Sequence, residues 1–372
     1  MLRVALVGCG KIADLHVQAI RRISGCQIVA LCDQELLMAR QLGERFRISQ
    51  CFSDVQEMLR CATPDVIHIT TPPQSHFAVA KQCLGAGTHV YLEKPFTVTA
   101  EEGQTLIQYA KQLGLMLTAG HNLQFTLEMV EMRRLVKEGF LGGEPVHLES
   151  HFPYSLADTS YIGPVLGSRN HWVRRLPGQL LHNIISHGIA KLAEFLDDEL
   201  DEIKAIAHQS SRLRDLGGEE VLDELRVFIR DKAGTTAFFS FSTQIKPGLN
   251  ELRVFGPVNS LVVDHGSGCL LRNKSLRFKS YLTYVFPPLR NAREHVRNAR
   301  RNLANILSRR LHQDSGMKEL IDRLYTSIRE GGEPPIPYRE ILLTARIMDE
   351  IFAQIYPSDK SSGVLVAESL KT

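Results

Sequence analysis

The chain lacks any apolar run of the roughly 20 residues that a membrane-spanning helix needs. Its seven cysteines include no Cys-x-x-Cys pair, and an odd number cannot close a complete disulfide framework. Most of them are therefore expected to be reduced, buried side chains. Because Met1-Leu2-Arg3-Val4 leads directly into an apolar strand, no signal peptide is predicted, and we expect the protein in the cytoplasm.

A large net charge is also missing. The 372 residues carry a formal charge of +3, and no nucleic-acid-binding motif is found, so no nucleic-acid partner is predicted. Hydrophobic residues make up 44% and charged residues 23%, which is typical of globular proteins and excludes wholesale disorder. The length predicts two domains.

Glycines lie where a dinucleotide-binding turn needs them. The apolar run Arg3-Val4-Ala5-Leu6-Val7 precedes Gly8-Cys9-Gly10-Lys11-Ile12-Ala13, and a helical pattern follows. Gly8 permits a tight turn, Gly10 lets the backbone approach a pyrophosphate, and Ala13 allows close packing of helix on strand. The phosphates would meet free N–H groups at the start of that helix. The cofactor-binding residues predicted here are Gly8, Gly10, Lys11 and Ile12.

An acidic residue ends the second predicted strand. Asp33 follows Gln27-Ile28-Val29-Ala30-Leu31-Cys32, and its carboxylate can accept both hydroxyls of the adenosine ribose. The same carboxylate would repel a 2′-phosphate. Gln34 and Glu35 follow instead of an arginine, so NAD is predicted in preference to NADP.

Strands and helices alternate up to residue 122, which predicts right-handed βαβ units and a doubly wound parallel sheet over residues 1–122. One predicted strand ends in Thr71-Pro72-Pro73-Gln74-Ser75-His76, and a later one, Thr88-His89-Val90-Tyr91-Leu92, ends in Glu93-Lys94-Pro95. Ligands bind beyond the carboxyl ends of such strands. Lys94 is therefore predicted to face the active site.

Several of these motifs resemble the glucose-fructose oxidoreductase, inositol dehydrogenase and rhizopine-catabolism (Gfo/Idh/MocA) family. Besides the motifs above they include Gly120-His121-Asn122 and Val136-Lys137-Glu138-Gly139-Phe140-Leu141-Gly142. The resemblance implies an NAD(P) domain, a second α/β domain whose open, mainly antiparallel sheet floors the active site, and a homo-oligomer, either a dimer or a tetramer. It adds to the expected cofactor contacts Thr71, Pro72, His76, Glu93, Lys94 and Asn122.

The second predicted domain covers residues 123–356, followed by a flexible tail at 357–372. Several strand patterns that follow one another without helices between them favour an antiparallel sheet. The strands are predicted at Pro145–Phe152, Asp201–Ala207, Glu224–Arg230, Thr235–Ser242, Glu251–Phe255 and Leu261–Asp264.

A helix predicted over Gln179–Leu196 carries Asn183 and His187 four residues apart, and hence on one face. By resemblance, the family places a catalytic aspartate and histidine here. Asn183 replaces the aspartate, and as a residue of the catalytic site it can orient a substrate hydroxyl but cannot exchange a proton. His187 suits general acid–base work on a substrate hydroxyl, and Lys94 would stabilise the developing alkoxide. The lysine is the alternative proton carrier if burial lowers its pKa.

The loop before this helix holds candidate substrate contacts, with simple loop packing as the alternative. They are Tyr154, Arg169, His171, Trp172 and Arg174. No metal site is predicted, because His171, His182 and His187 lack any familiar ligand spacing.

Basic residues are concentrated in a predicted helical insertion at 265–312. Eleven Lys or Arg and one Glu give this segment a charge of +10, which leaves −7 for the rest of the chain. Apolar residues at a three-to-four spacing predict an amphipathic helix: Leu289, Ala292, Val296, Ala299, Leu303, Leu307 and Leu311. It either packs on the domain or a sister subunit, or binds phosphates. The phosphates would belong to anionic lipids, met by residues 281–311, or to a diphosphate-linked sugar, which we prefer.

These patterns together predict an NAD-dependent oxidoreductase acting on a CH–OH group of a small-molecule sugar or nucleotide-sugar. Two alternatives stay open. One is a non-catalytic NAD-binding regulator of the same fold, which Asn183 keeps in consideration although Lys94 and His187 are present. The other is an epimerase or lyase that recycles its NAD.

Overall fold

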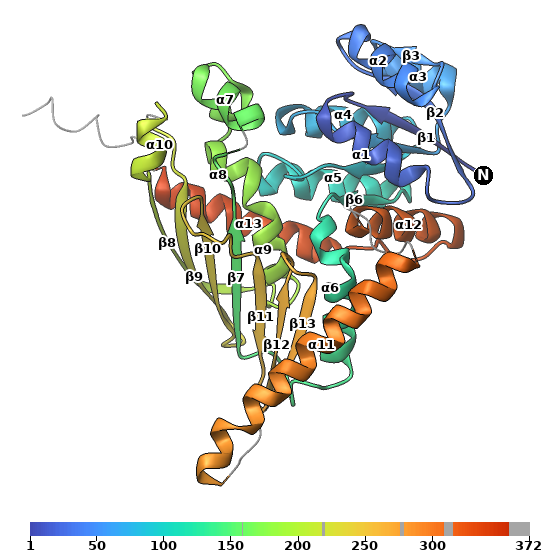
Figure 1. Ribbon diagram of the computed structural model, residues 1–372. Helices are drawn as coiled ribbons and strands as arrows, with labels where there is room; N and C mark the ends of the chain where they lie inside the picture. Colours follow the sequence, from blue (N-terminus) through green and yellow to red (C-terminus); the bar gives the residue numbers. More distant parts are fainter. Residues whose placement is uncertain (158, 218–219, 276–278, 309–314, 357–372) are drawn as a thin grey trace, which may run out of the picture.

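The computed structural model describes residues 1–157, 159–217, 220–275, 279–308 and 315–356 (Figure 1). Its described strands form two sheets. The first has six parallel strands in the order β3-β2-β1-β4-β5-β6, and the second has seven in the order β13-β12-β11-β7-β10-β9-β8. In the second sheet β7 and β10 pair in parallel, and the other neighbouring strands pair antiparallel. The predicted fold class is confirmed.

The first sheet alternates with helices along the chain. Its strands are β1 (Leu2–Val7), β2 (Cys26–Cys32), β3 (Cys51–Phe52), β4 (Val66–Ile69), β5 (His89–Leu92) and β6 (Leu117–Ala119). The helices between them are α1 (Lys11–Ile20), α2 (Leu36–Phe46), α3 (Val55–Ala62), α4 (Pro73–Gly85) and α5 (Ala100–Leu113), and the 3-10 turn η1 (Asn122–Phe125) follows. Helices on both faces explain why the inner strands read as continuous apolar runs.

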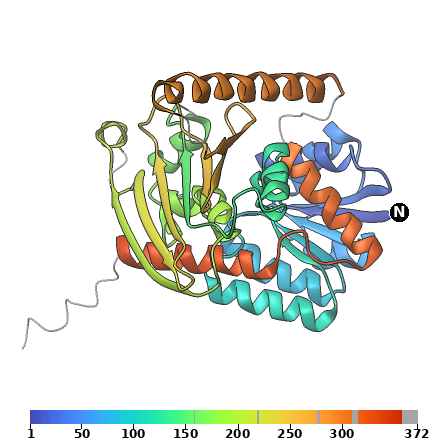
Figure 2. The same cartoon turned by 90° about the horizontal axis from the view of Figure 1, so that it is seen from below.

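The second sheet contains β7 (His147–Pro153), β8 (Leu200–His208), β9 (Glu224–Asp231), β10 (Thr236–Ser242), β11 (Glu251–Phe255), β12 (Asn259–Asp264) and β13 (Cys269–Lys274). Around it lie α6 (Leu127–Lys137), α7 (Thr159–Gly167), η2 (Trp172–Arg175), α8 (Gln179–Ile184), α9 (Ser186–Ala193), α10 (Ser211–Asp215), η3 (Ser280–Tyr284), α11 (Phe286–Leu307), α12 (Ser315–Glu330) and α13 (Tyr338–Ile355). Figure 2 shows α11 along one outer edge of the molecule. No helix in the described ranges is long and apolar enough to cross a membrane.

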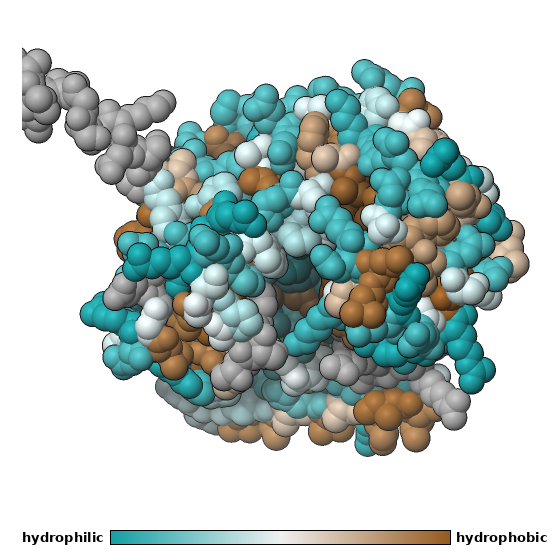
Figure 3. Space-filling model, turned by 90° about the horizontal axis from the view of Figure 1, so that it is seen from above, coloured by the Kyte–Doolittle hydropathy of each residue, from teal (hydrophilic) through white to brown (hydrophobic). Residues whose placement is uncertain are grey.

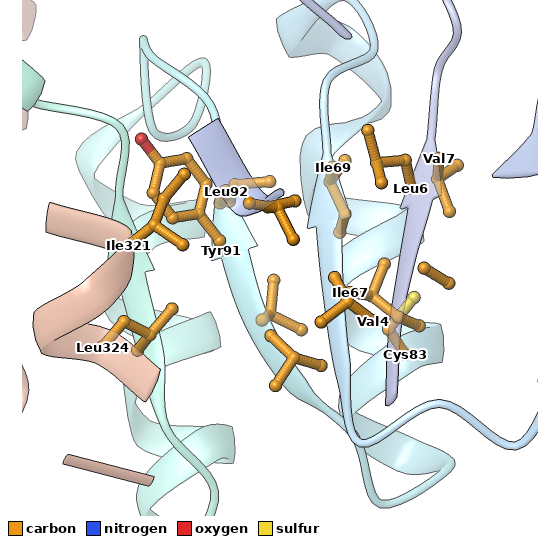
Figure 4. Packing of buried hydrophobic residues seen from close by; sticks show 14 of the residues in the cluster. Val4, Leu6, Val7, Ile67, Ile69, Cys83, Tyr91, Leu92, Ile321 and Leu324 are labelled. Atoms are coloured by element: carbon orange, nitrogen blue, oxygen red, sulfur yellow. The ribbon is translucent and has the colours of Figure 1, made fainter. Parts of the chain in front are cut away.

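Helix α12 returns to the first sheet. Ile321 and Leu324 belong to the same buried cluster as Tyr91 and Leu92, and Figure 4 shows these side chains together. The division predicted at residue 122 therefore does not describe the packing of α12, whose apolar stripe completes the core of the first sheet. This return was not visible in the sequence, because an amphipathic stripe does not specify which sheet it covers.

Three expectations about the second half are corrected. The segment expected to be helical from residue 265 begins with an additional strand, β13, which pairs with β12. The helix expected over 179–196 is two helices, α8 and α9, separated at Ile185. Its halves pack on different partners, α8 on η2 and α9 on β7 and α13, and this tertiary packing overrides the continuous helical pattern. The loop expected before it contains α7 and η2. The tail at 357–372 lies outside the described residues.

Candidate active site

Lys94 lies immediately beyond β5, between its neighbours β4 and β6. Its ammonium Nζ donates a hydrogen bond to the backbone carbonyl of Asn183, 2.9 Å away at the end of α8. This contact joins the first sheet to the second half of the chain. Burial lowers the pKa of Lys94, and the negative charge of Glu93 opposes that shift.

Glu93 is buried and fixes the turn that carries Lys94. Its Oε1 lies 3.0 Å from Nε2 of His16, and its Oε2 accepts the backbone N–H of Lys94 at 3.1 Å. A side chain at Gly120 would come within 2.8 Å of the same carboxylate, so the close approach requires glycine. Burial alone would raise the pKa of Glu93, but the hydrogen bond with His16 and the neighbouring positive charges hold it below its ordinary value.

A buried chain of polar side chains continues from Glu93. His16 Nδ1 lies 2.9 Å from His68 Nδ1, and His68 Nε2 lies 2.8 Å from the hydroxyl of Tyr325 on α12. In the tautomer of His16 that carries its proton on Nε2, His16 donates to Glu93 and accepts from His68, which accepts from Tyr325. The ring of Tyr91 stacks on His68 at 4.7 Å between centroids. Helix α12 is thereby connected to the turn that holds Lys94.

The glycine turn after β1 fits a dinucleotide. Gly8 has φ +95°, and a Cβ there would lie 2.8 Å from the backbone of Thr70 and Thr71, whereas a Cβ at Gly10 would meet nothing within 4 Å. No side chain caps the start of α1, where Lys11 and Ile12 lie in the first turn. The open backbone at Gly10 and the uncapped helix start suit a pyrophosphate.

Asp33 holds the end of β2 against the glycine turn. Its Oδ2 accepts the N–H of Cys9 at 2.7 Å and its Oδ1 accepts the N–H of Glu35 at 2.9 Å. Each carboxylate oxygen can accept a further hydrogen bond. The carboxylate is therefore oriented by the backbone and retains capacity for a ribose hydroxyl.

His76 connects two backbone segments on this side of the site. It is fully buried, with Nε2 2.8 Å from the carbonyl of Thr71 and Nδ1 3.0 Å from that of Pro95. A side chain with this burial and both nitrogens engaged is not suited to touch a cofactor directly, so we assign His76 to positioning. Pro72 precedes α4 as its N-cap, and the carbonyl of Asn122 packs closely against Gly316 at the start of α12.

His187 lies on α9, one turn beyond Asn183. Its Nδ1 is buried and has no hydrogen-bond partner among the described residues. The pKa of His187 is held well below its ordinary value, first by burial and then by the charge of Lys94. His187 is therefore neutral near pH 7 and able to accept a proton.

A lysine that was not predicted lies one turn further along α9. Lys191 is fully buried, its Nζ donates to the side-chain oxygen of Asn250 at 3.3 Å, and it lies 5.7 Å from the ring centroid of Phe152. The same phenylalanine ring lies 6.0 Å from the ring of His187. Burial lowers the pKa of Lys191 to about 7. The four-residue spacing from His187 was a usable signal in the sequence.

Two sequence models of protein families match the chain. One, described as an oxidoreductase family with an NAD-binding Rossmann fold, matches residues 2–121, and the GFO/IDH/MocA C-terminal domain matches residues 129–262. The chain belongs to the Gfo/Idh/MocA oxidoreductase family. The resemblance noted in the sequence is confirmed.

Relatives within the Gfo/Idh/MocA family are distant. A D-glucoside 3-dehydrogenase of Escherichia coli (strain K12) is 33% identical over 142 residues, which span 38% of this chain and 40% of that relative. The match therefore covers less than half the length of that relative.

Two solved structures resemble the whole chain. The WlbA dehydrogenase from Bordetella pertussis, in complex with NADH and UDP-GlcNAcA, has a TM-score of 0.75 at 18% identity and covers 95% of both chains. A 3-ketoreductase from Actinomadura kijaniata, in complex with TDP-benzene and NADP, has a TM-score of 0.66 at 17% identity, covering 94% of this chain and 96% of its own. At these identities the likeness shows the fold alone, and the two relatives hold different dinucleotides.

In this Gfo/Idh/MocA protein, the loop residues expected to contact substrate differ in what they contact. Arg174 donates from Nε to the carbonyl of Val165 at 2.8 Å, which favours loop packing. Trp172 accepts from Gln74 through its carbonyl at 2.7 Å, so η2 lies against the start of α4. The ring of His171, the N-cap of η2, lies 5.6 Å from the ring of Trp172 and is tilted relative to it. Tyr154 follows β7, and Arg169 is exposed.

Two further polar groups, in a cavity next to Pro95, were missed. Nδ1 of His121 and Oγ of Ser186 are buried without a hydrogen-bond partner among the described residues, and both residues line a cavity of about 10 Å³. That volume is near what a single water needs. Burial, opposed by Glu93, lowers the pKa of His121 to about 4. His121 belongs to a motif recognised in the sequence, but its neighbour Asn122 was chosen instead.

Proposed function

We propose that this protein is an NAD-dependent oxidoreductase that transfers hydride between a secondary alcohol of a sugar or nucleotide-sugar and the nicotinamide. One observation carries the proposal: Lys94, at the carboxyl end of a central parallel strand, bonds to the carbonyl of Asn183 one turn before His187. This contact brings a cation and a neutral imidazole to the strand edge where ligands of such sheets bind.

The chain supplies the proton chemistry and the bound dinucleotide supplies the hydride acceptor. Lys94 has three N–H donors and Asn183 uses one, which leaves two to stabilise the negative charge that develops on the alcohol oxygen. His187 accepts the proton that the hydroxyl loses. In the reverse direction His187 returns the proton to the carbonyl oxygen as it is reduced.

NAD is proposed over NADP because of the acidic end of β2. Asp33 is oriented by two backbone N–H groups, and Glu35 follows it, so a 2′-phosphate would approach two carboxylates. One solved relative is in complex with NADH and another with NADP, so this local chemistry is the basis for the choice.

A sugar or nucleotide-sugar is proposed as the substrate class. The E. coli relative is a D-glucoside dehydrogenase, and the B. pertussis relative is in complex with a UDP-linked sugar acid. Both sugars carry secondary hydroxyls, which is the group that the Lys94–His187 arrangement suits.

The test combines a substrate panel with one variant. UDP-, GDP- and dTDP-linked sugars, free sugars and inositols are incubated with NAD or NADP while reduced-nicotinamide absorbance is followed. With the active substrate, Lys94→Ala is expected to lower turnover by about 10² to 10³-fold while NAD binding, measured by calorimetry, persists. Lys81→Ala, an exposed lysine on α4, is the matched control.

Unchanged turnover in Lys94→Ala would contradict the assignment. Substrate conversion without a lasting change in absorbance would indicate that the hydride is returned, and an epimerase or lyase would replace net oxidation. NAD binding with no conversion across the panel would favour the non-catalytic regulator.

A further inference from the structure

Helix α11 is docked on the protein by its polar face. Asn298 is fully buried, its Oδ1 accepts the N–H of Leu270 at 3.1 Å, and its Nδ2 donates to the carbonyl of the same residue at 2.8 Å. Glu294 is also buried and pairs with Arg272 of β13 at 2.9 Å and with Arg297 at 2.7 Å. The helix thus satisfies the open edge of β13 with side-chain hydrogen bonds.

The opposite face of η3 and α11 is apolar and points outward. We call it the α11 stripe, and its members are between 45% and 84% exposed: Tyr281, Tyr284, Val285, Phe286, Leu289, Val296, Leu303, Ile306 and Leu307. Brown side chains line the lower edge in Figure 3, where Figures 1 and 2 place α11. A continuous exposed apolar surface of this kind marks an interaction site.

The charges beside the α11 stripe have one sign. Arg293 and Arg300 are exposed next to it, and Lys279 is exposed before η3. Within the described residues 279–308 the one acidic residue is Glu294, which is buried and paired. By sequence, residues 265–312 carry +10 against −7 for the remainder, so the two parts of the molecule differ strongly in charge.

The arginines on the docked side are already engaged. Arg290 donates to the carbonyl of Lys274 and Arg301 to that of Gly268, both at 2.8 Å along the β13 edge. A diphosphate-binding role for the whole basic helix, preferred at first, would have to rely on the outward arginines. These border an apolar stripe, which suits a surface better than a soluble anion. The family match also ends at residue 262, before α11 begins.

We propose that η3 and α11 form a docking surface for membranes rich in acidic phospholipids. The apolar side chains of the α11 stripe enter the boundary between headgroups and acyl chains, and Arg293 and Arg300 meet lipid phosphates. Tyr281 and Tyr284 lie at one end, and aromatic rings with a polar tip favour this boundary. The negative remainder of the chain is repelled by the same surface, which orients α11 toward it.

A second copy of the chain fits this surface less well. Although the stripe repeats at helical spacing, pairing two α11 helices would bring Arg293 and Arg300 close to one another without an exposed acidic residue in 279–308 to offset them. Anionic lipids complement both the apolar stripe and its arginines.

The test is vesicle flotation of the purified full chain. Vesicles of phosphatidylcholine mixed with phosphatidylglycerol are expected to carry the protein, vesicles of phosphatidylcholine alone are not, and added salt should release it. Arg293→Glu/Arg300→Glu should reduce binding by about tenfold or more. Arg212→Glu/Arg214→Glu, the same charge change at exposed positions of α10, should not.

A second pair of variants separates the apolar contribution. Leu289→Ser/Leu303→Ser keeps every charge and should also reduce flotation, with circular dichroism confirming the fold. Equal binding to neutral vesicles, or unchanged binding in both stripe and arginine variants, would overturn the proposal. A dimer seen by sedimentation that Leu289→Ser/Leu303→Ser dissociates, without vesicle binding by the parent chain, would assign the surface to a second copy instead.

Discussion

The two sides of the candidate site differ in how their polar groups are satisfied. On the first-sheet side, Asp33, His76 and Glu93 each engage partners through hydrogen bonds to backbone groups or to His16. On the α9 side, His187 Nδ1 and Ser186 Oγ are buried without partners among the described residues. Lys94 lies between them.

The difference indicates a division of labour. Groups that are paired in the protein contribute to stability and orientation, whereas buried groups left unpaired cost stability and persist where a ligand or a reaction uses them. The contrast is not complete, because His121 Nδ1 just after β6, and Tyr91 Oη and Thr118 Oγ1 of the first sheet, are also buried without a hydrogen-bond partner among the described residues. Substitutions can therefore test which side governs turnover and which governs stability.

The largest effect is expected at His187. His187→Ala removes the proposed proton acceptor and should lower turnover by about 10² to 10⁴-fold. The melting temperature should change little, because Nδ1 of His187 has no hydrogen-bond partner among the described residues. Steady-state kinetics and thermal melts measure the two quantities. His147→Ala on β7 is the matched control. A large fall in melting temperature with normal turnover per folded molecule would contradict this proposal, because His187 would then contribute to stability and not to turnover.

Asp33 should show the next largest effect. Asp33→Ala removes the carboxylate proposed to bind ribose hydroxyls and should weaken NAD binding by about 10 to 100-fold, because a hydrogen bond to a charged group contributes about 1.5–3 kcal/mol. NADP binding should weaken less, since its repulsion is removed at the same time. Calorimetry with both dinucleotides measures the ratio. An unchanged preference would show that Asp33 acts through the backbone turn at Cys9 and not through the cofactor.

Much of the fold was predictable because its signals are local. The strand Glu251–Phe255 was predicted with the bounds observed for β11, from the periodicity of its apolar residues and the turn residues that flank it. The strand β13 was missed because its sequence lies in a basic segment that reads as helical further on. The return of α12 to the first sheet depends on contacts distant in sequence, which no local pattern specifies.

The site shows the same limit. Lys94 and His187 were predicted, one from a strand end and the other from a family motif, and their roles stay proposals. The chain from Glu93 through His16 and His68 to Tyr325 could not be predicted, because it joins residues up to 257 positions apart. Lys191 was accessible to the four-residue spacing rule but was not predicted.

Lys191 should affect stability in a pH-dependent way. The pKa of Lys191 is about 7 in the folded protein, against an ordinary 10.5. Between these two pH values the unfolded chain binds more protons than the folded protein, so the free energy of unfolding rises with pH. Lys191→Met should lose this rise and be the more stable protein at pH 7, because a desolvated ammonium is replaced by an apolar side chain. Thermal melts of the parent protein and of Lys191→Met between pH 7 and pH 10.5 measure this difference in stability.

Turnover in Lys191→Met gives a second measurement. The charge of Lys191 helps to hold down the pKa of His187, so the acid limb of the pH profile should move to higher pH. Arg230→Met, an exposed cation on β9, should change neither quantity. A Lys191→Met protein that is less stable at pH 7 would mean that its hydrogen bond to Asn250 outweighs the desolvation.

The smallest effect, and the sharpest test of the paired side, is expected at Tyr325. Tyr325→Phe removes the hydroxyl that ends the chain on α12 and should destabilise the protein by about 1 kcal/mol, the ordinary net value of one buried hydrogen bond. Turnover should not change if the chain only positions Glu93. Tyr338→Phe is the matched control: it removes a hydroxyl that accepts a hydrogen bond from the N–H of Leu117 and does not belong to the chain that leads to Lys94. If turnover falls in Tyr325→Phe and not in Tyr338→Phe at equal stability, the chain moves protons between α12 and the Lys94 turn, and the first-sheet side takes part in the chemistry as well as in holding the cofactor.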